Sequence, residues 1–274
     1  MLKSISNQRA GDNMHKKIDM HNHTTRCNHA TGTVDEYITR AIELGIDIYG
    51  FTEHAPMDWD EHYRLSFDEM VEYEADILSA RDRYASQIDI RLGYEVDWIE
   101  GMVDSRVVEA DVDYLIGSIH FLDRWGFDNP EFIGEYEHRD IDTIWIDYFQ
   151  ALEQMANSGL FDIVGHMDLI KVFKFLPKTD IRLLAQDALK AIKSSGMVLE
   201  INAAGLRKPI AEQYPSRSLL EEVYSLDIPI SLGTDAHSVE QVGYGLDSIY
   251  ELAREVGYTK AVTFRKHDRQ LVNI

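Results

Sequence analysis

Short apolar runs alternate with longer amphipathic segments along most of the chain. Near-continuous apolar runs are typical of strands that are buried on both faces of a parallel sheet. We predict strands over residues 17–21, 46–52, 88–94, 114–119, 163–164, 197–201, 228–232 and 261–264.

The segments between these runs carry apolar residues at helical spacing. Within 67–84, for example, Met70, Ala75 and Ile77 fall roughly on one side of a helix that is otherwise charged. We predict helices over residues 34–44, 67–84, 105–110, 141–158, 180–194, 216–225 and 239–256.

Strands that alternate with helices are typical of a parallel α/β barrel. About seven strand–helix units can be counted, one fewer than in the usual TIM barrel. We therefore predict a distorted TIM-like (β/α)7 barrel in one catalytic domain over residues 14–274. Residues 1–13 are expected to be a flexible tail or a cloning remnant. The segment 121–139 lacks periodicity and is predicted to form a long loop over the site.

Composition and charge narrow the class of protein. No run of about 18 apolar residues exists, and residues 1–13 carry no apolar signal-peptide core. The single cysteine, Cys27, cannot form an intramolecular disulfide, which fits a reducing cytoplasm. The net charge of −21 argues against nucleic acid and anionic membrane as partners, because both reward basic patches. A small phosphorylated metabolite is compatible with this charge as a partner if bound cations make the site positive. Nothing in the sequence indicates an oligomeric state.

Seven of the eleven histidines lie in short motifs at or after predicted strands. With two carboxylates they make nine candidate metal ligands: His21, His23, His29, His54, Glu95, His120, His166, Asp235 and His237. The C-terminal ends of parallel strands meet at one face of a barrel, so we predict a metal site there. Nine ligands exceed the needs of one tetrahedral ion. They indicate two or three divalent ions, zinc, manganese or iron, in a hydrolytic site with open positions.

Two motifs carry most of this argument. The motif 19–23 places His21 and His23 on the same side of a strand, and the motif 235–237 repeats this spacing. Either motif alone could be a solvent-exposed pair or an ordinary turn, but two at separate strand ends reinforce one another. Asp19 is predicted to orient a ligand histidine from behind rather than to bind metal.

The other candidates divide by position. Glu95 ends a strand and is suited to bridge two metals, whereas Glu53 would point away from His54 and is predicted to be structural. Cys27 is also predicted to be structural. The histidines away from strand ends are predicted to be solvated, and these are His15, His62, His138 and His267.

A basic segment follows the predicted strand 197–201. Arg207 and Lys208 stand together in an otherwise acidic chain, which favours an anion-binding site in which Arg207 can hold phosphate oxygens. A solvated basic loop is the alternative. Lys171 is a weaker candidate substrate ligand, and no glycine-rich nucleotide-binding loop is present.

The ordered motifs resemble the polymerase and histidinol phosphatase (PHP) superfamily of metal-dependent phosphoesterases. The matching positions are Asp19-Met20-His21-Asn22-His23, His29, Glu53-His54, Glu95, His120, His166 and Asp235-Ala236-His237. The resemblance implies a trinuclear site in a distorted (β/α)7 barrel. It implies one ion held by His21, His23, Glu95 and Asp235, a second by Glu95, His120 and His166, and a third by His29, His54 and His237.

Within that superfamily, the segments 165–170 and 202–208 are similar to the histidinol-phosphate phosphatases of histidine biosynthesis. The resemblance implies hydrolysis of L-histidinol phosphate to L-histidinol and phosphate. The metals would activate water, and Arg207 would stabilise charge on the phosphoryl oxygens. Asp235 and His237 are candidate general acids. An acidic wall facing the amine is predicted from Asp58, Glu61 and Asp128.

Two other functions are compatible with these motifs. A phosphodiesterase or exonuclease on the same scaffold would bind a polyanion, and the net charge of −21 argues against it. A non-catalytic metal-binding module would need no complete ligand set, and the intact motifs argue against that.

Overall fold

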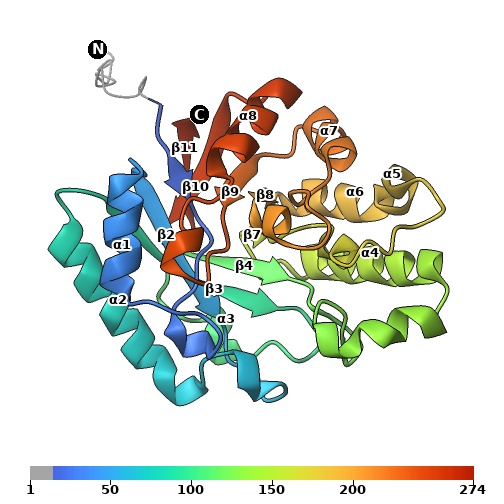
Figure 1. The fold of residues 1–274 in the computed structure, drawn as a ribbon, viewed down its shortest axis with the longest axis horizontal. Coiled ribbons are helices and arrows are strands. Elements are labelled where there is room, and N and C mark those ends of the chain that lie inside the picture. Colours follow the sequence, from blue (N-terminus) through green and yellow to red (C-terminus); the bar gives the residue numbers. More distant parts are fainter. Residues whose placement is uncertain (1–14) are drawn as a thin grey trace, which may run out of the picture.

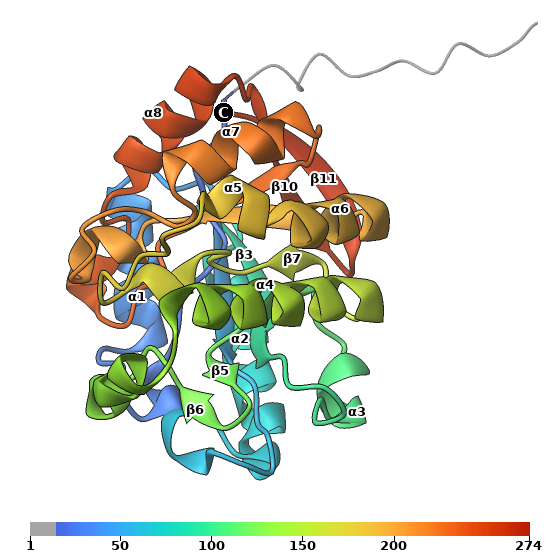
Figure 2. The ribbon, with the colours of Figure 1, turned by 90° about the vertical axis from the view of Figure 1, so that its right-hand side faces the viewer.

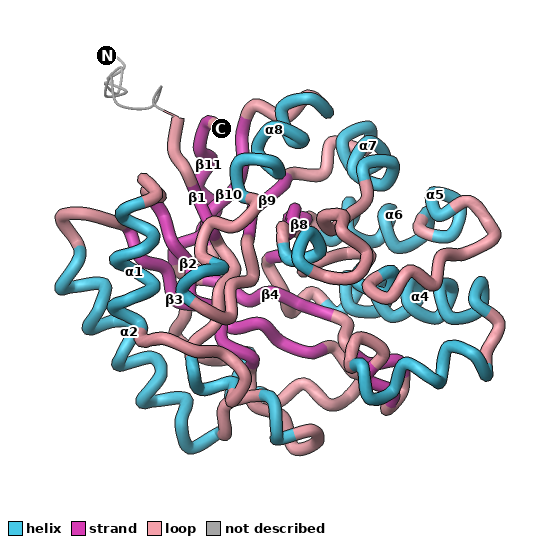
Figure 3. Tube along the Cα trace, in the orientation of Figure 1, coloured by secondary structure: helices cyan, strands magenta, loops and turns pink. Residues whose placement is uncertain are grey.

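Seven parallel strands form one sheet in the computed structural model, which describes residues 15–274; the predicted tail at 1–13 lies outside them. The sheet order is β1 (Ile18–Asp19), β2 (Ile48–His54), β3 (Asp89–Asp97), β4 (Tyr114–Ser118), β7 (Ile163–Val164), β8 (Val198–Asn202) and β9 (Ile230–Gly233). Met20 N donates to Leu232 O at 2.8 Å, and Asp235 N donates to His21 O at 2.7 Å. These bonds join the first strand to the last (Figures 1 and 3) and confirm the predicted distorted (β/α)7 barrel.

The helices surround the strands (Figure 2). They are α1 (Val34–Glu43), α2 (Met70–Tyr84), α3 (Ser105–Val108), α4 (Ile141–Ser158), α5 (Ile181–Leu184), α6 (Gln186–Ser195), α7 (Arg217–Ser225) and α8 (Leu246–Val256). The helix predicted over 239–256 begins only at Leu246, because Gly243 and Gly245 adopt φ values of +69° and +72° that do not continue a helix. Within residues 15–274, no helix is long and apolar enough to cross a membrane.

The C-terminal strand does not join the barrel. Strand β10 (Lys260–Arg265) pairs antiparallel with β11 (Asp268–Asn273) in a separate hairpin, and β11 was not predicted because most of its side chains are exposed and polar. The buried guanidinium of Arg91 on β3 donates to the carbonyl oxygen of Phe264 and to Gln270 Oε1. This bond network fixes the hairpin against the barrel at the N-terminal end of β3.

The segment 121–139 has more structure than the predicted loop. It contains a short hairpin of β5 (Phe121–Leu122) and β6 (Trp125–Gly126), followed by a 3-10 helix over Pro130–His138. The buried Tyr136 donates its hydroxyl to Ile170 O at 3.2 Å. The segment is therefore anchored to the chain that follows β7.

Gly50 in β2 lies where the barrel has no room for a side chain. Tyr114 Oη donates to Met20 O at 2.6 Å, and a Cβ at position 50 would collide with that hydroxyl and lie 3.0 Å from Met20 O. We expect Gly50→Ala to lower the free energy of unfolding by about 1–3 kcal/mol through overpacking, as measured by urea denaturation. Gly134→Ala is the matched control, because a Cβ there meets nothing within 4 Å. Equal unfolding midpoints for the two variants would contradict the prediction.

Candidate metal centre

The nine predicted ligands gather at one end of the barrel. Each lies at the end of a strand or just beyond it, except His29, which follows a 3-10 turn over Thr25–Cys27. The ligands come from β1 (His21, His23), β2 (His54), β3 (Glu95), β4 (His120), β7 (His166) and β9 (Asp235, His237). Parallel strands bring these side chains together although His21 and His237 stand far apart in the sequence.

Glu95 stands at the centre of the cluster, with only 1% of its surface exposed. Its Oε2 lies 3.3 Å from His21 Nε2, 3.5 Å from His23 Nε2 and 3.0 Å from His54 Nδ1. Its Oε1 lies 2.8 Å from His166 Nε2 and 3.6 Å from His120 Nε2. One buried carboxylate therefore faces five imidazoles, a geometry suited to a bridging ligand.

Four groups of side-chain atoms are close enough to hold an ion, and three of them consist only of predicted ligands and share members. One is His21, His23 and Glu95; another is Glu95, His120 and His166; a third is His23, His54 and His237. Asp235 Oδ1 lies 3.1 Å from His23 Nε2, beside the first group. His29 groups instead with Cys27 and His237, and its Nδ1 faces Cys27 O at 2.8 Å.

Unpaired polar atoms inside the cluster test whether metal ions fit it. The buried atoms without a hydrogen-bond partner among residues 15–274 include four that face the cluster: His21 Nε2, His23 Nε2, Glu95 Oε2 and His237 Nε2. Leaving buried polar atoms unpaired is costly. Imidazole nitrogens and carboxylate oxygens that converge in this way are the ligands that zinc, iron and manganese accept. The residues therefore fit a cluster of two or three divalent ions.

Carboxylates behind the ligands hold the far ring nitrogens. Glu200 Oε1 lies 2.7 Å from His21 Nδ1, and Asp97 Oδ1 lies 2.7 Å from His120 Nδ1. Glu53 Oε1 lies 3.4 Å from His23 Nδ1, so its predicted structural role is to support this ligand. In each case the Nδ1 proton is held and Nε2 is left to face the cluster.

Two of these supporting carboxylates, Glu200 and Asp97, were not predicted from the sequence. Glu200 is a charge inside an apolar strand, and buried charges are rare unless paired. Asp97 follows Glu95 by two residues and so shares its face of β3. Both signals are visible in the sequence, but neither identifies the partner.

Asp19 holds backbone rather than a ligand ring. Its carboxylate accepts from Thr234 N at 2.9 Å, Thr234 Oγ1 at 2.5 Å and Asn22 Nδ2 at 3.1 Å. Burial raises the pKa of Asp19 to about 6 despite these bonds. The predicted contact with a ligand histidine is not present; Asp19 instead ties the end of β9 to β1.

A cavity of about 340 Å³ opens onto the cluster. Arg207 and Lys208 line it, and so do Asp235 and His237. Arg207 Nη2 donates to Thr234 O at 2.8 Å and Asp235 O at 2.9 Å, while its buried Nη1 has no partner in the described chain. This nitrogen is an available donor for an anionic oxygen.

Lys171 does not line this cavity, in contrast to the predicted role in substrate binding. Its ammonium is buried and lies 3.0 Å from Asp168 Oδ2 and 2.7 Å from Glu212 Oε2, and it donates to Gln213 O at 2.8 Å. All three of its protons are thus used within the protein.

A second cavity, of about 280 Å³, lies along the same cluster at His29, His54 and His120. Its other walls include Asp60, Tyr63, Arg64, Asp128 and Phe132. Asp128 lines both cavities, but Asp58 and Glu61 line neither.

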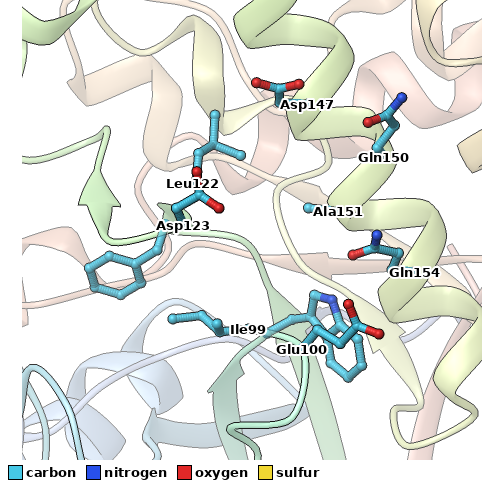
Figure 4. A pocket seen from close by; sticks show the side chains of 10 residues that line it. Ile99, Glu100, Leu122, Asp123, Asp147, Gln150, Ala151 and Gln154 are labelled. Carbon is cyan, nitrogen blue, oxygen red and sulfur yellow. The ribbon is translucent and has the colours of Figure 1, made fainter.

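A third cavity, of about 440 Å³, is shown in Figure 4. Its walls include Glu100, Asp123, Gln150 and Gln154, and none of the nine predicted ligands lines it.

Metal loading is expected to release protons at pH 7. Burial lowers the pKa of His23 and of His120, but nearby carboxylates outweigh it and raise these pKa values to about 9 and about 10. Carboxylates, chiefly Glu200 and Glu95, also outweigh burial at His21 and hold its pKa well above the ordinary value. The three rings are therefore protonated at pH 7 without metal, and each must lose a proton to bind. We expect roughly three protons per protein by calorimetry in buffers of different ionisation enthalpy, with fewer released as the pH rises through the pKa values of these rings. Zinc binding at pH 7 without proton release would contradict this.

Comparisons with known proteins agree with this geometry. The family model described as PHP domain matches residues 19–204. A Deinococcus radiodurans protein named "Probable histidinol-phosphatase" is 40% identical over 92% of this chain and 98% of its own. The histidinol-phosphatase of Bacillus subtilis is 30% identical over 86% of this chain and 99% of its own. The crystal structure of histidinol phosphate phosphatase from Lactococcus lactis, complexed with zinc, L-histidinol and phosphate, has a TM-score of 0.77 and 23% identity, with 93% of this chain and 99% of that chain covered.

Proposed function

The chain belongs to the PHP domain family, and on that premise we propose that it is a metal-dependent phosphomonoesterase that hydrolyses L-histidinol phosphate to L-histidinol and phosphate in histidine biosynthesis. The Deinococcus radiodurans and Bacillus subtilis relatives carry the name histidinol-phosphatase. The observation that carries the proposal is the pair of unlike cavities along one ligand cluster. The first includes Arg207 and Lys208 among its walls, and the second includes Tyr63, Phe132 and the carboxylates of Asp60 and Asp97 beside Arg64.

The phosphate belongs in the cavity lined by Arg207 and Lys208. Bound divalent ions in such a site polarise phosphoryl oxygens and lower the pKa of water toward neutrality. Arg207 Nη1 supplies a fixed donor for an equatorial oxygen, since its Nη2 is already bound to two carbonyls. Asp235 and His237 line the same cavity and stay the predicted candidates for protonating the leaving oxygen.

The leaving group belongs in the second cavity. L-Histidinol carries an ammonium and an imidazole ring, and Asp128 offers a carboxylate for the cation, whereas Asp60 is already paired with Arg64. Tyr63 and Phe132 are 39% and 48% exposed and offer faces on which a ring can stack. A substrate that spans both cavities would place its phosphorus beside the metal ligands that the cavities share.

The carboxylates of the second cavity also bear on whether the protein is a nuclease. They would repel the neighbouring phosphates of a nucleic acid strand, which disfavours a nuclease. The reaction is expected in the cytoplasm, because the one cysteine, Cys27, is free and buried.

The test is phosphate release from L-histidinol phosphate by the full chain loaded in turn with zinc, manganese or iron. Glycerol phosphate and single-stranded DNA are the comparison substrates. We expect kcat/KM for L-histidinol phosphate to exceed that for glycerol phosphate by at least about 100-fold, since the second cavity binds only the former leaving group. Equal kcat/KM values for the two phosphate monoesters would contradict the assignment of L-histidinol phosphate as the substrate. Degradation of DNA would support an exonuclease, and no turnover of any substrate would support a binding module.

A further inference from the structure

We propose that Arg64 is a positioning residue for the metal ligand His120. It acts through Asp97 and so sets the affinity of the ion position formed by Glu95, His120 and His166. The inference rests on the metal centre that the proposed function uses, and it holds whatever the substrate is.

Every nitrogen of the Arg64 guanidinium donates a hydrogen bond within the protein. The residue is 5% exposed and lies between β2 and α2. Its Nη1 donates to Asp97 Oδ2 at 2.7 Å and to Ala55 O at 3.2 Å. Its Nε donates to Asp60 O at 2.6 Å, and its Nη2 donates to Asp60 Oδ2 at 3.0 Å. With every nitrogen bonded, the side chain has little freedom to move.

Asp97 divides its two oxygens between Arg64 and His120. Oδ2 accepts from Arg64, and Oδ1 lies 2.7 Å from His120 Nδ1. With Asp97 Oδ1 facing Nδ1, the His120 ring is oriented so that its Nε2 points toward Glu95 and the metal position.

Loss of Arg64 would remove the only cationic side chain that bonds Asp97 besides His120 within residues 15–274. The carboxylate would then be buried with one oxygen unpaired, a costly arrangement. It would then be free to turn away from His120. That movement would release the fixed orientation of the His120 ring, and partners of this kind alter metal affinity by about 10–100-fold.

A purely structural role for Arg64 predicts something different. Arg81 on α2 offers the matched comparison, because it also pairs with a buried aspartate of the barrel. Its Nε donates to Ile90 O at 2.8 Å and its Nη2 pairs with Asp113, near the N-terminal ends of β3 and β4. Removing Arg81 therefore costs a similar ion pair far from the ligands.

The experiment titrates the metal-free full chain with Zn²⁺ against a chelating indicator, for Arg64→Met, Arg64→Lys and Arg81→Met. In Arg64→Met we expect one ion to bind about 10–100-fold more weakly while the others are unchanged. Arg64→Lys should recover part of that affinity by restoring the charge.

Unchanged zinc affinities in Arg64→Met would overturn the proposal, and so would loss of the same ion in Arg81→Met. If Arg64→Met fails to fold, Asp97→Asn takes its place, because it keeps the side-chain shape and alters the same link to His120. Unchanged zinc binding in a folded Asp97→Asn would be equally decisive. Zinc binding is read without substrate, so this failure would be distinct from failure of the proposed phosphatase activity.

Discussion

Glu95→Gln is expected to lower kcat/KM for phosphate release by at least about 10³-fold, which corresponds to about 4 kcal/mol of transition-state stabilisation. Glu95 belongs to two of the four groups of side chains that could hold an ion, and it faces five imidazole nitrogens. An amide is a poor ligand, and its NH₂ cannot bridge ions. The variant should therefore lose both the shared ligand and the negative charge that holds adjacent cations together.

The measurement pairs activity at saturating metal with elemental analysis of the purified protein. We expect fewer bound ions in Glu95→Gln than in the parent chain. Glu100→Gln is the control, because Glu100 is an exposed glutamate on the loop after the same strand and lines a different cavity. A Glu95→Gln protein with activity within tenfold of the parent would show that this carboxylate is not the centre of the site.

Arg207→Ala is expected to lower kcat/KM by about 10²–10³-fold, the usual effect of removing one fixed donor to a transition-state oxygen. Its unpaired Nη1 is buried at the cavity that we assign to phosphate. Inhibition by inorganic phosphate should weaken in parallel, because the product presents the same oxygens. Arg207→Lys should recover only part of the loss, since an ammonium cannot hold two carbonyls and one phosphoryl oxygen in the same geometry.

Metal content separates this effect from an indirect one. Arg207 Nη2 also holds the carbonyls of Thr234 and Asp235, so its loss could disturb a ligand. A normal number of bound ions in Arg207→Ala would assign the lost activity to the phosphate contact. Arg217→Ala is the control, because Arg217 forms only exposed ion pairs on α7. A loss below about threefold would contradict the assignment.

The position of the metal centre could be predicted because the ligands follow the strands. Parallel strands deliver residues such as His54 and His166 to one face whatever the length of chain between them. The fold follows from the same alternation of apolar and amphipathic segments. These predictions depend on local pattern and on the topology of the barrel, and both are legible in the sequence.

Pairing between distant side chains could not be predicted in this way. Lys171 is as basic as Arg207, yet its ammonium is consumed by Asp168 and Glu212. Glu200 and Asp97 support ligands from strands of their own, and only the packed barrel shows which ligand each one reaches. The polar strand β11 was missed for a related reason, since only its partner β10 makes it a strand.

Both ends of the described chain lie on the side of the barrel away from the metal centre. Lys16 precedes β1, and its N donates to Asn273 O at 3.0 Å in the last strand, whereas the ligands follow the opposite ends of the strands. A fusion partner, an affinity tag or a covalent surface anchor joined after Ile274 would therefore project away from the substrate entrance. The enzyme should accept immobilisation through this end with its cavities open to solution.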